Sequence, residues 1–581
     1  MNHRILIVTL LSLVSVFIVS TVTVYADGGI RYVATTGSNT SDCTNPVFPC
    51  RTVQFALDQA APGDEVRVAQ GTYTDMNSYG GLSQAVYISK TVTVRGGYSA
   101  DFSAWDPAAY TTTLDAHGAG RVLYITGNIS PTVEGLRITN GNAAGLGGGP
   151  GGSNAGGGIY VINATATISG NTIISNTASY GGGVYLFYSD ATLTGNTISG
   201  NSAYYDGGGV YLYQSDATLT GNTFSGNTAS GYNSAGGGVY LYHSNNVTLT
   251  GNTIISNTAS DRGGGVYVDG DSTLDDNVIA ENSGDGVYIA GADPVLRHNT
   301  IARNTGNGVR VTDRDGTYSH VVLTNTILVS NTAGISVTAG STAKLEGTLW
   351  GSGTWANGKD WGGGGSITTG TVNLWADPGF VDPDGGDYHI LPTSAAVDAG
   401  VDAGLTTDID GDPRPSGAGY DIGADEWNPC LRPVTTVTIA GPSAGYTSAV
   451  YVFTATVTPA DATEPISYTW TPAPTAGSGS NVTYTWATTG THVITVTAQN
   501  CGGVATATHT ITITARPVTC PVPLTGVAIV GPTELLKQYF RHLSSGMRPD
   551  IYHLVVPFNV GNHTLFILPN GFSDILPGGI E

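Results

Sequence analysis

The chain has 581 residues, of which 83 are glycine, only 11% are charged, and its formal net charge is −22. A hydrophobic fraction of 40% argues against an intrinsically disordered chain. The acidic charge argues against nucleic acid as a partner, because its field repels phosphate. This composition is typical of a β-rich extracellular protein, and the length leaves room for several domains.

Residues 1–26 predict a secretory signal peptide. Arg4 belongs to a short polar start, residues 5–24 are apolar, and small or permissive residues precede the expected cleavage after Ala26. The length of the apolar run also allows an uncleaved membrane anchor. In both cases the rest of the chain is exported, so we expect a secreted or cell-surface protein without a later membrane span.

Five cysteines in an exported chain predict two disulfides and one unpaired thiol. Cys43 and Cys50 would close a short loop, and Cys430 and Cys501 would bracket a later domain. Cys520 is then left over.

Residues 27–120 are expected to form an N-terminal cap and the first coils of a solenoid. The segment 52–61 has apolar residues at helical spacing, begins with a polar Thr and ends before Pro62 and Gly63. An amphipathic helix here would cover the open end of a solenoid core.

A repeated unit dominates the chain between residues 159 and 309. Each copy has a glycine cluster, a Val or Ile usually followed by Tyr, a short alternating strand and an Asn-containing turn. Successive copies begin 25, 26, 29, 27, 21 and 22 residues apart, which is typical of a solenoid. The copies begin at Ile159, Val184, Val210, Val239, Val266, Val287 and Val309.

Each repeat also carries two asparagines five residues apart. Asn tolerates a left-handed backbone, and its amide can bond to the amide of the next coil, so we expect Asn ladders at two corners. The pairs are Asn171/Asn176, Asn196/Asn201, Asn222/Asn227, Asn252/Asn257, Asn277/Asn282 and Asn299/Asn304.

Between these corners the side chains alternate with a period of two, as in residues 184–187, so aliphatic residues should point inward and aromatic residues outward. Successive strands can then pair in parallel at about 4.8 Å per coil. We therefore predict an all-β protein, with a right-handed parallel β-helix over residues 121–375 followed by an immunoglobulin-like β-sandwich.

Particular motifs support this fold by resemblance. The segment CRTVQFALDQAAPGDEVRVAQGTY resembles the N-terminal part of exported β-helix proteins of the pectate-lyase-like superfamily. The repeats GGGVY and NTFSGN are similar to the GGA[ILV] and FxxN repeats of polymorphic outer-membrane proteins. Proteins with such folds include lyases, hydrolases and catalytically inactive adhesins, so the resemblance implies a fold rather than an activity.

Residues 376–429 carry a different signature, including TDIDGDPRPSGAGYDIGADEW, which resembles the closing module of many exported β-helices whose members carry interchangeable surface anchors. Asp408, Asp410 and Asp412 alternate beside a glycine, as in loops that bind Ca²⁺. The alternative that we favour is a capping turn whose Asp side chains bind backbone amides.

Residues 430–515 have six short Thr/Val-rich strands and resemble a PKD-like, immunoglobulin-like module, with the match carried by ISYTW and GTHVITVTAQN. The usual WDFGDG is absent, which puts any cation or glycan role of that loop in doubt.

Residues 516–581 begin as a second copy of this module, because Cys430, Pro433, Gly441 and Pro442 recur as Cys520, Pro523, Gly531 and Pro532. From Glu534 onward the composition changes. We interpret this segment as a truncated or frameshifted second repeat, and the alternative is a divergent C-terminal domain.

The only concentration of charge lies in the last coils. An Arg/Asp group with a nearby His could bind an acidic sugar and move a proton, and the alternative is a set of surface ion pairs. The candidate catalytic residues are Arg297, His298, Arg303, Arg310, Asp313 and Asp315.

Outward aromatic residues at two neighbouring positions of each coil predict a stripe for carbohydrate binding, since such rings offer flat surfaces and hydroxyl partners. In the alternative, the rings stack on one another or lie beneath the glycine-rich loops. The candidates are Tyr160, Tyr185, Tyr211, Tyr213, Tyr240, Tyr242, Tyr267 and Tyr288.

The favoured function is therefore that of a monomeric β-helix protein that binds an extracellular polysaccharide or cell-surface glycan, or serves as a structural scaffold, with no cofactor unless Ca²⁺ binds. The alternative is a polysaccharide lyase or glycoside hydrolase.

Overall fold

A computed structural model describes residues 28–428, 432–463, 465–516 and two short strands, β50 (Val556–Pro557) and β51 (Thr564–Leu565). The chain divides into two compact units, residues 1–429 and residues 430–581. The expected signal peptide, Cys430, Cys520 and most of the expected second repeat lie outside the described residues, so those expectations stay predictions.

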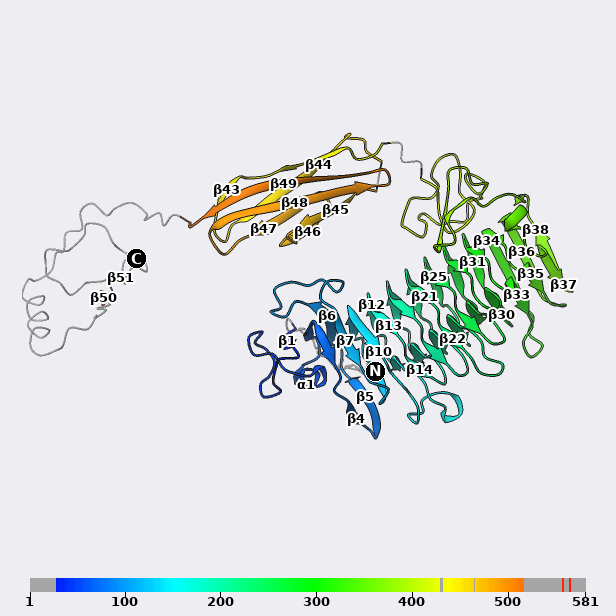
Figure 1. The fold of residues 1–581 in the computed structure, drawn as a ribbon, viewed down its shortest axis with the longest axis horizontal. Helices are drawn as coiled ribbons and strands as arrows, with labels where there is room; N and C mark the ends of the chain where they lie inside the picture. Colours follow the sequence, from blue (N-terminus) through cyan, green and yellow to red (C-terminus); the bar gives the residue numbers. More distant parts are fainter. Residues whose placement is uncertain (1–27, 429–431, 464, 517–555, 558–563, 566–581) are drawn as a thin grey trace, which may run out of the picture. The chain divides into compact units, whose positions relative to one another are not determined.

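The first unit is a parallel β-helix (Figure 1). Its first sheet contains twelve strands, and all neighbours pair in parallel except β4 and β5, which form an antiparallel hairpin. In chain order the strands are β4 (Asn77–Tyr79), β5 (Leu82–Ile88), β8 (Arg121–Thr126), β11 (Ile159–Ile162), β15 (Val184–Phe187), β19 (Val210–Tyr213), β23 (Val239–Tyr242), β27 (Val266–Asp269), β30 (Val287–Ala290), β33 (Asn307–Thr312), β35 (Ala333–Val337) and β37 (Trp361–Gly363).

A 23-stranded sheet supplies the other two sides, as two parallel columns that meet in the long strands β34 and β36. One column has β1 (Ile30–Val33), β2 (Glu65–Ala69), β6 (Thr93–Tyr98), β9 (Thr132–Glu134), β12 (Thr167–Ser169), β16 (Thr192–Thr194), β20 (Thr218–Thr220), β24 (Thr248–Thr250), β28 (Thr273–Asp275), β31 (Val295–Arg297), β34 (His320–Val329), β36 (Thr342–Leu349) and β38 (Ser366–Thr369).

The other column has β3 (Gly71–Tyr73), β7 (Thr112–Asp115), β10 (Leu136–Thr139), β13 (Thr172–Ile174), β17 (Thr197–Ser199), β21 (Thr223–Ser225), β25 (Thr253–Ile255), β29 (Val278–Ala280), β32 (Thr300–Ala302) and β39 (Asn373–Leu374). A small four-stranded sheet adds β14 (Thr177–Ala178), β18 (Ser202–Ala203), β22 (Thr228–Ala229) and β26 (Thr258–Ala259).

The structure confirms two predictions made from the repeat: aliphatic side chains fill the β-helix core, and asparagines form ladders at two corners. Val184 and Leu186 of β15 are fully buried among the aliphatic side chains of neighbouring coils. Both Asn columns form ladders in which each side-chain amide donates to the Oδ1 of the next coil, as from Asn196 to Asn222 at 2.9 Å. The second ladder continues past Asn304 to Asn331 and Asn357.

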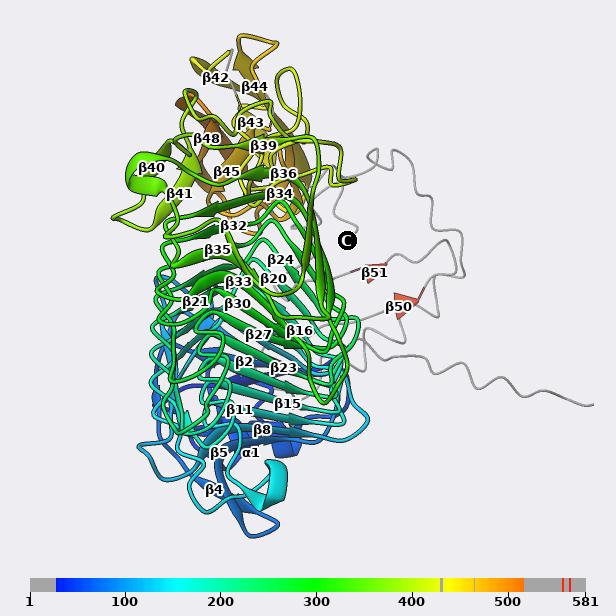
Figure 2. The same cartoon turned by 90° about the vertical axis from the view of Figure 1, so that its right-hand side faces the viewer.

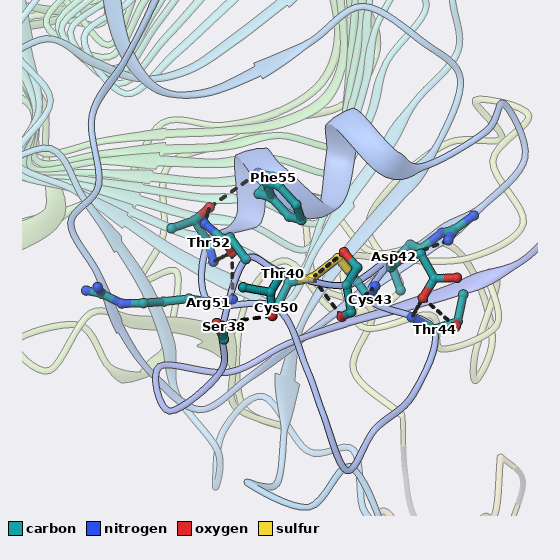
Figure 3. The surroundings of a disulfide bond; sticks show 12 residues. Ser38, Thr40, Asp42, Cys43, Thr44, Cys50, Arg51, Thr52 and Phe55 are labelled. Carbon is teal, nitrogen blue, oxygen red and sulfur yellow. Dashed lines mark hydrogen bonds between the residues drawn. A yellow bond between two sulfur atoms is a disulfide. The ribbon is translucent and has the colours of Figure 1, made fainter.

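A helix and a disulfide close the N-terminal end. Helix α1 (Val53–Gln59) is capped by the Thr52 side chain, which accepts a hydrogen bond from the Phe55 amide, and it buries Val53, Ala56 and Leu57 on the core. The predicted Cys43–Cys50 disulfide forms beside it (Figure 3). The amphipathic helix therefore lies where the apolar spacing predicts.

The segment 376–428 packs against the flank of the last coils and contains one hairpin, β40 (Phe380–Asp382) and β41 (Asp387–Ile390). Its apolar side chains cover Val278, Ala280 and Ala302, which point away from the β-helix core on β29 and β32. Earlier coils have Thr or Ser at several of these places, as in β17 and β21, because no segment covers them there.

The second unit contains a β-sandwich of two four-stranded sheets. One sheet has β42 (Thr436–Ala440), β44 (Val450–Thr458), β47 (Asn481–Thr485) and β46 (Ala476–Ser478), and the other has β43 (Ala444–Tyr446), β49 (Gly503–Thr514), β48 (Gly490–Asn500) and β45 (Ser467–Thr471). Across the described part of the chain, no helix has the length and apolar character needed to cross a membrane.

Candidate functional site

The first aromatic row runs along the outer face of the twelve-stranded sheet, whose strands succeed one another along the axis in Figure 2. Equivalent positions of neighbouring strands pair in register, as Tyr185 with Tyr211. Ring centroids of neighbours lie 4.5–5.5 Å apart. The row comprises Tyr124, Tyr160, Tyr185, Tyr211, Tyr240, Tyr267 and Tyr288.

Most of this row is buried, although it lies outside the β-helix core. The glycine before each of these strands packs closely against the base of the tyrosine side chain: a Cβ on Gly207, whose φ is +67°, would lie 2.7 Å from the Tyr211 Cβ. Tyr185 is 0% exposed and Tyr211 is 2% exposed. The expectation that this row is open to a ligand is therefore wrong for Tyr160, Tyr185, Tyr211, Tyr240 and Tyr267, and the alternative of a covered stack describes them.

Burial also keeps these hydroxyls protonated, because it disfavours the phenolate. It raises the pKa of Tyr160 to about 12, and the pKa of Tyr211 rises further. The row is therefore a structural element rather than a source of acid–base groups.

The second aromatic row consists of Phe187, Tyr213 and Tyr242, one at the end of each of β15, β19 and β23. Its side chains are partly exposed. Their rings stack at 5.1 Å with interplanar angles of 30° and 20°, so much of each flat face is covered by the next ring. This row offers chiefly ring edges and hydroxyl groups to solvent.

Directly after this row, each strand turns through one residue with positive φ: Tyr188 (48°), Gln214 (48°) and His243 (46°). The Tyr188 ring meets the Phe187 ring at 71°, and the His243 ring meets the Tyr242 ring at 62°, so both lie across the stack. Both side chains are about half exposed, at 50%. We call Tyr188, Gln214 and His243 the platform.

The platform residues occupy a left-handed backbone conformation that favours glycine, and a later coil has Gly291 at this turn with φ of +63°. A non-glycine residue in the left-handed region costs roughly 1 kcal/mol or more. Three larger polar or aromatic side chains therefore stand where glycine would have a lower conformational free energy. Backbone strain of this kind clusters at functional surfaces.

The loop 312–319 closes one end of the platform. Arg314 lies 5.1 Å from the centroid of the Tyr242 ring and forms an ion pair with Asp269. A Cβ on Gly291 would lie 2.9 Å from the Arg314 Cβ, so glycine is required beneath this loop. Burial and the neighbouring Arg314 lower the pKa of His243, which is therefore neutral at pH 7.

The charged residues predicted to form a catalytic group are not brought together. Arg297 pairs with Asp275 at 2.6 Å, and Arg303 pairs with Asp384 at 2.7 Å in the segment 376–428. His298 is fully buried against this segment, and burial lowers its pKa to about 3. These three side chains attach the closing segment to the coils.

The remaining candidates lie on another side of the coil, because the chain passes a corner before it enters β33. Arg310 packs over the Tyr288 ring at 5.6 Å. Asp313 and Asp315 are exposed on the loop 312–319. The alternative of surface ion pairs and packing contacts therefore fits these residues better than a shared active site.

The three aspartates proposed for Ca²⁺ have separate roles. The carboxylate of Asp408 accepts hydrogen bonds from the amides of Asp410, Asp412 and Glu426, as the capping-turn alternative predicts. Asp410 instead accepts from His389 at 2.7 Å, and with Asp425 these residues have ligand atoms within 4.8 Å of one another. The hydrogen bond to Asp410 raises the pKa of His389 to about 10, so an imidazolium already balances this charge.

Sequence reasoning found the two aromatic rows but missed the platform. The available signal was the residue after the second aromatic position, where Tyr188, Gln214 and His243 stand in three repeats and glycine stands in later ones.

Comparisons with known proteins agree with the architecture. Residues 111–273 and 232–349 match the right handed beta helix region family, and residues 436–513 match the PKD domain family. These matches confirm the predicted fold class and the β-helix and PKD resemblances. No curated protein matches the chain by sequence.

Three solved structures of mutants of the periplasmic alginate epimerase AlgG are similar, each covering 53% of this chain and 73% of theirs. Their identities are 14%, 14% and 13%, with TM-scores of 0.34, 0.33 and 0.29. Values this low carry no argument about activity.

Proposed function

We propose that this protein, a right-handed β-helix followed by a PKD domain, acts outside the cell and binds an extended polysaccharide across the platform of Tyr188, Gln214 and His243. The observation that carries this proposal is the pair of half-exposed rings, Tyr188 and His243, that lie across the aromatic stack two coils apart, with Gln214 on the coil between them.

The chemistry of the platform suits a sugar chain. The face of a pyranose ring is apolar and packs on an aromatic ring, while its hydroxyls need polar partners at the edge. Tyr188 supplies an aromatic surface, and Gln214 and His243 supply hydrogen-bonding groups one and two coils further along. Because neighbouring coils are about 4.8 Å apart, an extended chain along the axis would meet all three in turn.

The backbone provides independent support. The left-handed conformation of these turns favours glycine, which a later coil has at Gly291. Large side chains in a strained backbone conformation are expected where those side chains contact a ligand.

The test is affinity electrophoresis of the purified protein through gels that contain plant, algal or bacterial polysaccharides. In the variant Tyr188→Gly/His243→Gly, glycine adopts the backbone conformation of the turn without strain, so the free energy of unfolding should stay within about 1 kcal/mol of the parent. The variant should no longer be retained by the polysaccharide that retains the parent. The control is Tyr232→Ala, which removes a tyrosine that is 87% exposed elsewhere on the surface.

Two results would overturn the proposal. One is that no polysaccharide retains the parent protein, and the other is that the double variant is retained as strongly as the parent and the Tyr232→Ala control.

One observation favours a second function, that of a polysaccharide lyase. His243 is neutral and lies 3.5 Å from Asp269, which pairs with Arg314. A neutral imidazole could take the proton beside the carboxylate of a uronate, and its electron pair would form the new double bond as the glycosidic oxygen leaves and takes a proton from water. Release of new unsaturated chain ends from an acidic polysaccharide, lost in His243→Gly, would establish this function instead.

A further inference from the structure

Two carboxylates form a short row beside the platform: Asp190 and Asp216 stand two residues after Tyr188 and Gln214, and Asn245 stands at the same place after His243. Asp190 accepts a hydrogen bond from the amide of Asp216 on the next coil at 3.0 Å, and Asp216 accepts one from the Asn246 side chain at 3.1 Å. Both aspartates are exposed and, among the ion pairs of the described residues, neither takes part in one. Each therefore keeps acceptor capacity for a ligand.

No cationic side chain balances this row. Residues 159–260, which contain the whole platform, include no lysine, arginine or glutamate, and their only charged residues are Asp190, Asp206 and Asp216. The nearest cation at the end of the platform is Arg314, and Asp269 already neutralises it. A net charge of −22 over the chain adds to the same negative field.

An anionic polymer on this surface would lose hydration without gaining a counter-charge, and juxtaposed like charges disfavour binding. An uncharged sugar chain is not repelled by these carboxylates. Its hydroxyls can donate to the carboxylates, and hydrogen bonds to a charged acceptor are about twice as strong as neutral ones.

Resting on the proposed function, we infer that the ligand is an uncharged polysaccharide, whose hydroxyls donate to Asp190 and Asp216 while a sugar ring packs on Tyr188. The chain runs along the β-helix axis and meets the loop 312–319 at the Arg314 end of the platform. The carboxylate row thus selects against uronate and sulfated polymers as well as holding the neutral one.

The experiment compares the full chain with the variant Asp190→Asn/Asp216→Asn in gels that contain matched neutral or uronate polysaccharides, at low and near-molar salt. Asn keeps the Oδ1 acceptor of the ladder, so folding should not change. We expect the parent to be retained only by a neutral polymer, with little dependence on salt. The variant should bind that polymer about tenfold more weakly, because two charge-assisted hydrogen bonds become neutral ones. It should also be retained more strongly by the uronate polymer at low salt than the parent is.

The outcomes separate the two proposals. Retention of the parent by a uronate polymer, weakened by salt, would overturn the inference and leave polysaccharide binding in place. Unchanged neutral binding in the variant would also overturn it. Absence of retention by every polymer would instead remove the proposed function itself.

Discussion

At the scale of single residues, the buried asparagines explain how so many backbone groups at the corners are satisfied. Asn227 accepts from both the backbone amide and the side chain of Asn201, each at 3.0 Å. Its own amide donates to Ile198 and to Asn257. Each ladder residue therefore serves three neighbouring coils, and no other uncharged side chain of this size combines these donors and acceptors.

Replacing one ladder residue should be costly. Asn227→Ala leaves the donors of Asn201 and the carbonyl of Ile198 buried without partners, so we expect a loss of about 2–5 kcal/mol in the free energy of unfolding. Urea unfolding of the β-helix measures this loss. The control Asn245→Ala removes an exposed asparagine with a single backbone partner and should cost less than about 1 kcal/mol. Equal losses in the two variants would contradict the ladder argument.

Positive-φ residues at one corner show that this backbone conformation is reused for different purposes. Glycine occupies it in five successive coils, from Gly135 to Gly251, and then Asp276, His298 and Asn325 occupy it at φ of 51–52°. Each of these three contacts the segment 376–428, as Asn325 does through the Val401 backbone. Non-glycine residues thus replace glycine where their side chains gain a partner.

At the scale of elements, the attachment of the closing segment depends on one buried cation. Arg414 is inaccessible to solvent and donates to Glu426 at 2.7 Å and to Asp276 at 3.1 Å. It also binds the backbone carbonyls of Gly423 and Ala424. The arginine links a loop of the segment to a corner of the coil, which no local sequence pattern connects.

Removal of this side chain should release the segment. Arg414→Ala leaves two buried carboxylates without a counter-charge, which costs about 3–5 kcal/mol. Hydrogen exchange over residues 376–428 should accelerate while the coils before residue 250 keep their protection. The control Arg432→Ala breaks an ion pair to Asp461 whose side chains are 55% and 63% exposed, and it should change stability by less than about 1 kcal/mol. Unchanged exchange in Arg414→Ala would contradict this role.

At the scale of the whole molecule, the chain has separate hydrophobic cores in its two units. The coils share one continuous cluster of inward aliphatic residues from Val33 to Trp350. The sandwich has its own cluster around Phe453 and Trp470. The two units are therefore expected to unfold as distinct cooperative transitions.

Phe453→Ala tests this independence. Phe453 is fully buried in the sandwich, so the substitution should destabilise that unit by about 3–5 kcal/mol and leave the β-helix transition unchanged. Differential scanning calorimetry of the full chain resolves the two transitions. Val452→Ala, on the same strand but 56% exposed, is the matched control and should shift neither by much. A shift of both transitions in Phe453→Ala would refute the independence of the units.

The sequence alone determined the coils, the ladders and the cap, because each depends on a local period. The two-residue period of residues 184–187 shows which side chains point away from the core. The recurrence of the Asn pairs shows which corners of successive coils stack on one another. The short helix after Thr52 follows from apolar spacing in the same way.

Only the tertiary structure decided which outward residues reach solvent. The period of a repeat predicts whether a side chain points into the core or away from it. It does not predict whether other parts of the chain then bury that side chain. Tyr211 is 2% exposed between two stacked rings, whereas Tyr188 is 50% exposed. Likewise, Arg297 and Arg303 meet partners that lie some eighty or more residues away in sequence, in the segment 376–428. Exposure and partnership of this kind arise from long-range packing, for which the repeat itself carries no signal.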